Sequence, residues 1–268
     1  MSVVHVSLRN VTRVYGGAGG GSPLHALGPL DLDLTKGEFF AVVGPSGCGK
    51  STLLEVIAGL ATTSQGTVEF EGRAVAGTIP DGVGVVFQED ACFPWLTVAG
   101  NIAFGLRQSG LAASETAALV RHAIDLMGLA EFADAYPAQL SGGMRQRVCI
   151  ARTLVMRPRL ILLDEPFGAL DQQTRLLMGE ELLRLWRETG ATVLLITHAL
   201  DEAVMLADRI GVMSARPGRL LDIVETAWPR ERDSRIIADP TFGRITARLW
   251  QSLREESLKT MGKRPHVA

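Results

Sequence analysis

The chain has 268 residues, 47% of them hydrophobic and 21% charged, which fits one large folded domain or a core with a smaller lobe and excludes disorder over most of the length. Its 27 Lys and Arg residues against 29 Asp and Glu residues give a net charge of -2, so there is no general basic field and we expect no nucleic-acid partner. The three cysteines have an odd count and no zinc spacing, which argues against a disulfide framework or a metal site. No apolar run approaches the roughly 18 residues that cross a bilayer, so we expect any membrane role to come through a partner.

The first quarter of the chain is predicted to form an antiparallel β region. Residues 4–15, 30–34 and 66–75 alternate apolar and polar side chains with a period of two and are punctuated by glycines. The run GGAGGG, residues 16–21, follows the first of these segments, and no helical pattern comes after it. We therefore interpret it as a flexible connection between two strands and not as a phosphate-binding loop.

Short apolar runs and longer helical patterns alternate through the middle of the chain. Residues 114–127 carry apolar side chains at helical spacing before Gly128, and a second helix is predicted over residues 172–189, where Gly190 ends it. The order of strand, helix and strand predicts a parallel sheet. The predicted buried strands are Phe39–Val43, Val83–Phe87, Leu160–Leu163 and Val193–Ile196.

The composition changes after Thr226, where charge density rises and prolines interrupt the sequence. Only residues 242–253 keep a helical pattern there. We expect residues 226–268 to form a C-terminal appendage with one helix and a frayed tail after Lys259.

A glycine-rich run, GPSGCGKS at residues 44–51, follows a buried strand and precedes the apolar helical run TLLEVIAGL. In that context the glycines let successive backbone N–H groups face phosphate oxygens, and the start of the helix adds partial positive charge. Lys50 would reach the β and γ oxygens of ATP, and the Ser51 hydroxyl would ligate Mg²⁺. The predicted nucleotide-binding residues of this loop are Gly44, Pro45, Ser46, Gly47, Cys48, Gly49, Lys50, Ser51 and Thr52.

Two acids, Asp164 and Glu165, follow the apolar run LILL. A parallel sheet would deliver both to its carboxyl edge, where such sheets bind ligands. Asp164 would hold Mg²⁺ through its coordinated water, and Glu165 would polarise the water that attacks the γ-phosphate. Two acids after a strand are by themselves a common start of a loop, but beside a phosphate loop they predict ATP hydrolysis.

The run LSGGMRQR, residues 140–147, predicts a second anion site, because Ser141 can cap the following helix while Gly142 and Gly143 leave its first N–H groups open. With the phosphate loop and LLDEP, this run resembles the ATPase subunit of an ABC transporter over nearly the whole chain. The resemblance implies an α/β P-loop NTPase core with a parallel sheet, an N-terminal antiparallel β subdomain and an inserted helical subdomain. The ATPase domain would span residues 1–225, and the helical subdomain about residues 90–157.

The resemblance implies ATP and Mg²⁺ as cofactors and gives roles to three more residues. Tyr15 resembles the aromatic residue that stacks on adenine, and Gln88 resembles the glutamine that senses Mg²⁺ and the attacking water. By themselves these two would be interpreted as a tyrosine at a strand edge and a surface glutamine. His198, after the strand VLLIT, resembles the histidine that contacts the γ-phosphate.

The resemblance also implies that two copies work together. In the family, the run at Ser141, Gly142 and Gly143 serves the ATP of the opposite subunit, and the loop that GALD at residues 168–171 resembles crosses the dimer interface. Met144 departs from the family, where many members carry glutamine. Methionine cannot donate the hydrogen bond of that glutamine, but the serine and the backbone N–H groups remain, so we expect activity to survive.

An aromatic segment, ACFPWLTVAGNIAFGL at residues 91–106, follows Gln88 at the place where family members receive a short helix from the membrane subunit. The alternative is a locally buried core. With PWLTVAGNI, DEPFGALD and ARPGR, the chain is similar to importer ATPases of the nitrate, sulfonate and taurine group.

That similarity implies a peripheral ATPase on the cytoplasmic face of the inner membrane. It would drive uptake of a small anionic solute through two membrane permease subunits fed by a periplasmic solute-binding protein. The alternatives are a soluble ABC ATPase acting in translation or DNA maintenance, and a small-molecule kinase. The first would carry two ATPase units or long coiled coils, neither of which is seen, and the LSGGM run and His198 argue against the second.

Overall fold

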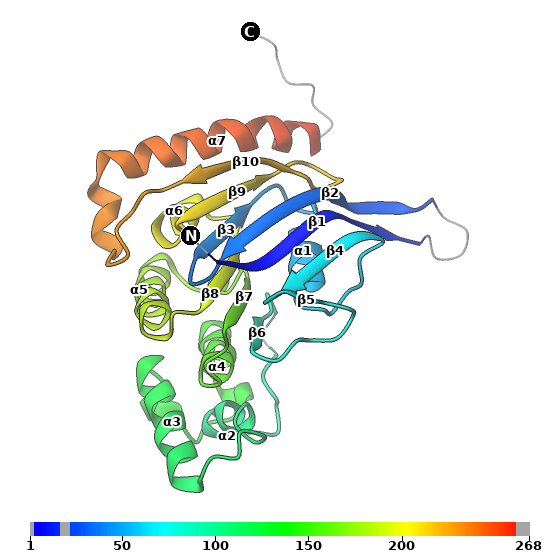
Figure 1. The fold of residues 1–268 in the computed structure, drawn as a ribbon. Helices are drawn as coiled ribbons and strands as arrows, with labels where there is room; N and C mark the ends of the chain where they lie inside the picture. Colours follow the sequence, from blue (N-terminus) through cyan, green and yellow to red (C-terminus); the bar gives the residue numbers. More distant parts are fainter. Residues whose placement is uncertain (1–2, 17–21, 90, 261–268) are drawn as a thin grey trace.

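The computed structural model describes residues 3–16, 22–89 and 91–260 and contains two sheets (Figure 1). The larger sheet has six strands in the order β10-β9-β3-β8-β7-β6, and the smaller has four in the order β2-β1-β4-β5. The strands are β1 Val4–Tyr15, β2 Leu24–Thr35, β3 Phe39–Val43, β4 Gln65–Phe70, β5 Arg73–Ala74, β6 Val83–Val86, β7 Leu160–Asp164, β8 Thr192–Ile196, β9 Arg209–Met213 and β10 Leu220–Glu225.

Seven α-helices and three short 3₁₀ helices are found in the described part of the chain, and none of them combines the length and apolarity that a membrane-spanning segment requires. The α-helices are α1 Lys50–Ile57, α2 Val98–Phe104, α3 Ala113–Leu126, α4 Gly142–Leu154, α5 Gln172–Thr189, α6 Leu200–Leu206 and α7 Pro240–Thr260. The 3₁₀ helices are η2 Ala130–Phe132, η3 Pro137–Gln139 and η4 Ser234–Ala238.

The pairing of the strands confirms the predicted fold class. Strands β6, β7, β8, β3 and β9 pair in parallel, and β10 adds an antiparallel edge to β9. In the smaller sheet β1 pairs antiparallel with both β2 and β4, as the alternating sequence predicts. The segment that joins β1 to β2 was predicted as a flexible connection, and residues 17–21 of it lie outside the described residues.

The larger sheet is buried on both faces, which explains its continuous apolar strands. On β3, Phe39 and Ala41 pack with residues of α4, α5 and α6, whereas Phe40 and Val42 pack with α1 and the smaller sheet. Successive side chains of a strand point to opposite faces, so each strand contributes to two hydrophobic clusters. The sheet is therefore fixed in position from both sides.

The helical region lies at one end of the molecule, below the larger sheet in Figure 1, and consists of α2, α3 and α4 with η2 and η3. Thr97 caps α2 by accepting a hydrogen bond from Gly100 N. The Oδ1 atom of the buried Asn101 accepts a hydrogen bond from Phe93 N. Its Nδ2 atom donates to the carbonyl oxygens of Phe93 and Leu96. This side chain fixes the aromatic segment to the start of α2.

Some predicted boundaries differ from the structure. The strand after Gly82 ends at Val86, because Phe87 has already turned outward and is exposed. The C-terminal helix is longer than the predicted residues 242–253, since α7 runs from Pro240 to Thr260 and buries Glu256, whose polarity hid the last turns from an apolar pattern. The helices at residues 114–127 and 172–189 agree within a residue, and Gly190 ends the second with φ 65. Residues 261–268 of the predicted tail lie outside the described residues.

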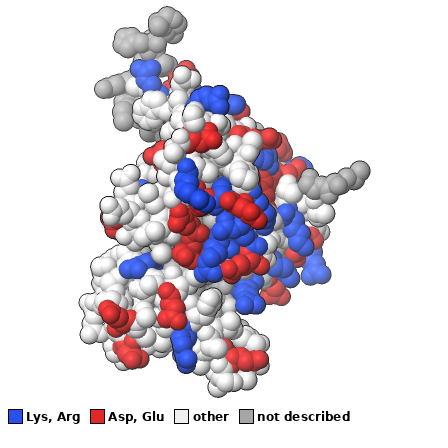
Figure 2. Space-filling view, turned by 90° about the vertical axis from the view of Figure 1, so that its left-hand side faces the viewer, with Lys and Arg blue, Asp and Glu red and all other residues white. Residues whose placement is uncertain are grey.

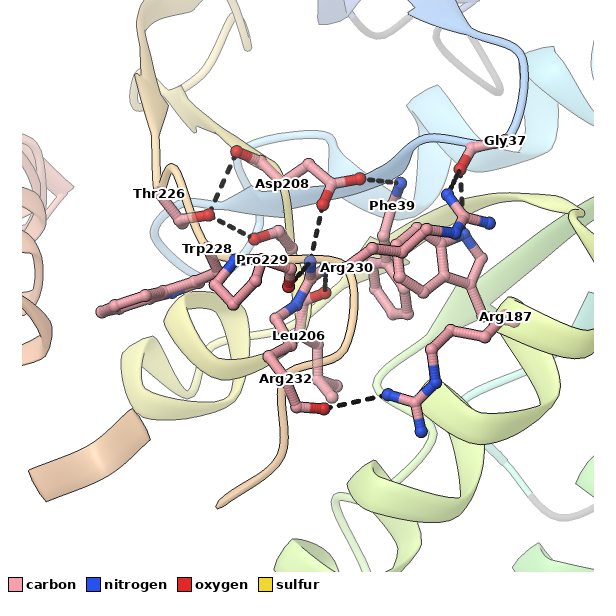
Figure 3. A network of polar contacts seen from close by, with 12 residues as sticks. Gly37, Phe39, Arg187, Leu206, Asp208, Thr226, Trp228, Pro229, Arg230 and Arg232 are labelled. Atoms are coloured by element: carbon pink, nitrogen blue, oxygen red, sulfur yellow. Dashed lines mark hydrogen bonds and ion pairs between the residues drawn. The ribbon is translucent and has the colours of Figure 1, made fainter. Parts of the chain in front are cut away.

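The chain after β10 is joined to the core by a network of polar contacts (Figure 3). The side chain of Arg232 is 0% exposed, lies over the Trp186 ring and donates to Asp208 and to the Leu206 carbonyl. Asp208 in turn accepts from Phe39 N on β3, and Trp228 Nε1 donates to the Val204 carbonyl on α6. Residues 226–232 are therefore packed against α5 and α6.

The surface beside this network carries mixed charge. Figure 2 shows the face on which α5 lies, with acidic and basic side chains interleaved over its middle. On α5 itself, Arg184 is paired with Glu181 at 2.9 Å and with Glu188 at 2.8 Å. Such partly exposed pairs stabilise a helix only modestly.

We predict that Arg232→Ala lowers the free energy of unfolding by about 3 kcal/mol, because it leaves a cavity, an unpaired Leu206 carbonyl and a half-buried Asp208 without its cation. Denaturant unfolding measures the change. The matched control is Arg235→Ala, since Arg235 is 87% exposed and its ion pair in the described part of the chain is with its neighbour Asp233, and we expect it to leave stability unchanged. Equal effects of the two variants would contradict a structural role for the network.

Candidate functional site

The phosphate loop lies between β3 and α1, so its start is fixed by a fully buried strand. Gly47 and Gly49 have φ values of +72 and +110, a region that side chains disfavour, and a Cβ on Gly49 would lie 2.5 Å from the Ala26 carbonyl oxygen. No side chain caps α1, so its first N–H groups remain open to an anion. The loop has the geometry that a phosphate cradle needs.

The Lys50 ammonium lies within this loop. Its Nζ donates to the carbonyl oxygens of Gly44 at 2.9 Å and Pro45 at 3.1 Å, and the residue is buried. An arriving phosphate would offer the same ammonium a charged acceptor, which makes a stronger hydrogen bond than a carbonyl does. Cys48 is also buried, and burial raises the pKa of its thiol, which keeps this side chain of the loop uncharged.

Asp164 ends β7 beside the loop and is only 8% exposed. Burial raises the pKa of its carboxyl, and a hydrogen bond with Ser51 opposes the shift. Its Oδ1 is buried without a hydrogen-bond partner among the described residues. A hydroxyl and a carboxylate with an unsatisfied oxygen fit a hard cation such as Mg²⁺, which takes oxygen ligands.

Three of the predicted residues meet at the carboxyl edge of the sheet. The Oε2 atom of Glu165 accepts a hydrogen bond from Gln88 Nε2 at 3.2 Å and lies 3.1 Å from His198 Nδ1. The three side chains follow β6, β7 and β8, which are neighbours in the sheet. Glu165 has φ 46, a conformation that a residue other than glycine adopts at a cost and that is common at functional sites.

A hydrogen bond that the sequence did not predict holds the backbone next to Gln88 in place. The buried Gln146 on α4 donates from Nε2 to the Phe87 carbonyl at 3.2 Å, one residue before Gln88. Gln146 belongs to the LSGGMRQR run, so the helix that begins with that run also holds the backbone beside Gln88. The sequence places Gln146 in this run, but it could not predict its hydrogen bond to Phe87, which is 59 residues away.

Tyr15 ends β1 and its hydroxyl lies 3.4 Å from Glu55 Oε2 on α1, the helix that follows the phosphate loop. Arg13 covers the Tyr15 ring at 4.6 Å from its centroid. The structure therefore places Tyr15 beside α1, the helix that follows the phosphate loop.

Ser141 caps α4 as predicted, accepting from Met144 N at 3.2 Å. In the described part of the chain, Ser141 accepts hydrogen bonds from Met144 N and Arg145 N, both in the first turn of α4. Gly142 and Gly143 follow it at partly exposed positions. Within the described residues, Ser141 is thus an exposed N-cap whose hydrogen bonds stay at the start of α4.

Glu202 is a further titratable group near the site that sequence reasoning missed. Its carboxyl accepts from Thr197 Oγ1 at 3.0 Å, next to His198, and its other oxygen is buried without a partner among the described residues. Burial raises the pKa of Glu202 to about 7, against the attraction of Thr197 and Arg175, while Glu165 adds to the rise.

We predict that Glu202 makes stability depend on pH. From pH 4.5 to about 7 the native carboxyl keeps a proton that the unfolded chain has released, so the free energy of unfolding falls as the pH rises through this window. Glu202→Gln cannot ionise and should flatten this part of the profile in urea unfolding. The control is Glu181→Gln on the surface of α5, which should keep the slope of the parent. A parental slope in Glu202→Gln would show that the carboxyl is ionised in the native protein.

Known proteins with similar sequences include ATP-binding proteins named for import. The chain is 48% identical over 222 residues to the taurine import ATP-binding protein of Pseudomonas aeruginosa, covering 81% of this chain and 84% of that protein. It is 41% identical over 257 residues to the nitrate import ATP-binding protein of Synechocystis, covering 94% and 96%.

The fold has a close counterpart among solved structures. A dimeric ATP-binding cassette in a post-hydrolysis state, bound to ADP and Pi, is 31% identical and superimposes with a TM-score of 0.74 over 84% of this chain and all of that one. The family model of the ABC transporter matches residues 27–168, from β2 through the phosphate loop to the acid pair. The chain belongs to the ABC transporter family and is an ATPase.

Proposed function

We propose that this chain is the ATP-hydrolysing subunit of an importer, peripheral on the cytoplasmic face of the inner membrane, that takes up a small anionic solute such as a sulfonate, taurine or nitrate. The observation that carries the hydrolytic role is the meeting of Gln88 and His198 on one oxygen of Glu165. The import functions named for the taurine and nitrate relatives support transport over a role in translation or DNA maintenance.

In the proposed mechanism each residue has one task. The N–H groups of the phosphate loop and Lys50 hold the ATP phosphates. Ser51, Asp164 and Gln88 would hold Mg²⁺, which supplies charge neutralisation at the β- and γ-phosphates when it is bound. Glu165 orients the attacking water and accepts its proton, and His198 donates to the γ-phosphate.

The proposed working state is a dimer. The similar solved cassette is dimeric, and in this chain Ser141 caps α4 from an exposed position, followed by the partly exposed Gly142 and Gly143. We infer that this run of one copy closes on the ATP held by the phosphate loop of the other. Closure and reopening of that pair would convert binding and hydrolysis into movement of the membrane subunits.

The proposed contact with the membrane subunits is the aromatic patch, which we define as Phe93, Trp95 and Phe104. The rings of Phe93 and Trp95 stack at 5.5 Å, those of Phe93 and Phe104 lie 4.5 Å apart, and Trp95 is 69% exposed. This exposure argues against the alternative of a locally buried core at Trp95. Because the patch begins five residues after Gln88 in the sequence, a helix docked on it would be linked through a short segment to the proposed hydrolytic site.

Glu165→Gln tests the hydrolytic role. We expect ATP turnover to fall at least about 100-fold, because glutamine cannot accept the proton of the attacking water, while ATP binding remains. The variant should elute as a dimer with ATP in size-exclusion chromatography. Lys50→Ala serves as the comparison that loses ATP binding and therefore stays monomeric. Turnover at the parental rate in Glu165→Gln would remove Glu165 as the base.

Trp95→Ser tests the docking surface. We expect co-purification with the permease subunits from membranes to fall about 30-fold or more, the effect of losing an interface residue that dominates binding, with the ATPase rate of the isolated chain unchanged. Trp250→Ser on α7 is the matched control, since Trp250 is also largely exposed but lies outside the patch. Equal retention of the permease by both variants would place the docking surface elsewhere.

A further inference from the structure

The loop between β9 and β10, residues 214–219, forms an outer wall of the phosphate loop. Gly218 lies so close that a Cβ there would be 2.2 Å from the Cys48 carbonyl oxygen. Its N–H donates to the Ala26 carbonyl at 3.1 Å, and its own carbonyl accepts from Gly28 N at 2.8 Å. The ARPGR run, which the sequence marked only as a family resemblance, is thus pinned between β2 and the phosphate loop.

Arg216 makes a direct hydrogen bond to the phosphate loop. Its Nε donates to the Gly47 carbonyl oxygen at 3.0 Å, and its Nη2 would lie 3.0 Å from a Cβ on Gly47. Two successive carbonyls of the phosphate loop, those of Gly47 and Cys48, therefore face the 214–219 loop. Neither contact involves the residues that were predicted to bind nucleotide through their side chains.

The orientation of these carbonyls determines where the next N–H groups point. In a trans peptide unit the C=O and the following N–H point in opposite directions. When the Gly47 and Cys48 carbonyls face the 214–219 loop, the N–H groups of Cys48 and Gly49 must face the other way, into the cradle. The Cys48 N–H donates to the Pro45 carbonyl at 3.3 Å within the loop, and Lys50 Nζ donates to the same carbonyl.

The C-terminal helix holds this loop in place. Glu256 on α7 is 5% exposed and accepts a hydrogen bond from Ala215 N at 2.7 Å. Ser214 Oγ accepts from Arg219 N at 3.0 Å, which closes the loop on itself. A surface hollow is lined jointly by the phosphate loop, the 214–219 loop and α7, through Ser46, Gly47, Arg216, Glu256 and Lys259.

We propose that Arg216 is a positioning residue for nucleotide binding. It holds the Gly47 carbonyl outward so that the N–H groups of the phosphate loop face the ATP phosphates, and α7 sets its position through Glu256 and Ala215. Because the N–H groups of such a loop bind the α- and β-phosphates, Arg216 acts on ADP and ATP alike. The C-terminal helix is then part of the nucleotide site.

The test is the affinity of the isolated chain for MgADP and MgATP, measured by titration calorimetry. Arg216→Ala should weaken both by the same factor, about 5- to 10-fold, the effect of one charge-assisted hydrogen bond at an exposed position. Arg216→Lys should recover part of the loss, because it keeps the charge but not the Nε–H. In ATPase assays the KM of Arg216→Ala should rise, with kcat within about twofold of the parent.

Two further comparisons separate positioning from charge and from folding. Arg219→Ala removes the same charge from the same loop, but among the described residues the Arg219 side chain makes no hydrogen bond to the phosphate loop, so we expect parental affinity. Glu256→Ala should reproduce the affinity loss in part, whereas Glu256→Gln, which keeps an acceptor oxygen for Ala215 N, should not. Thermal unfolding of each variant shows whether the fold is retained.

Three outcomes would contradict a positioning role for Arg216. Parental ADP affinity in a folded Arg216→Ala variant would mean that the hydrogen bond does not orient the loop. An equal loss of nucleotide affinity in Arg219→Ala would mean that the charge of the loop attracts the nucleotide at long range and that Arg216 does not position the phosphate loop. A loss for ATP alone would indicate that Arg216 touches the γ-phosphate directly.

Discussion

The carboxyl edge of the parallel sheet is the constraint on which the site depends. Parallel strands all end on the same side, so β3, β7 and β8 bring the phosphate loop, the acid pair and His198 to the same edge of the sheet. The edge is held in place because the strands behind it are buried on both faces. A strand slipped by one residue would move a whole set of side chains to the wrong face, so the packing fixes the register of the strands that precede Gln88, Glu165 and His198.

The sequence was sufficient for the parts of the fold that follow from local pattern. Uninterrupted apolar runs identified β3, β7 and β8, and glycine placement identified the end of α5, because these features depend on residues close together in the chain. The phosphate loop could be predicted for the same reason, since a strand, a glycine-rich turn and a helix start are consecutive. Only the family resemblance suggested that Gln88, Glu165 and His198 act together. They come into contact because β6, β7 and β8, which precede them, are neighbours in the sheet.

Other contacts were out of reach of a single sequence because they join segments that are far apart. Gln146 and Phe87 are 59 residues apart, and Arg216 and Gly47 are 169 apart. Nothing in the local pattern around Glu202 or Glu256 indicates that their carboxyls are buried, since both lie on helices rich in charge. The residues proposed to position the site were thus harder to predict than those proposed to carry out hydrolysis.

The C-terminal segment was predicted as an appendage because its composition differs from that of the core. In the structure Arg232 is buried against Trp186, and Phe242 and Leu249 of α7 belong to the same hydrophobic cluster as the central sheet. Burial on this scale ties the stability of the segment to that of the ATPase core, so α7 cannot move independently at little cost. A helix so firmly attached is suited to holding the 214–219 loop, because a support that fluctuates would not fix the direction of the carbonyls it controls.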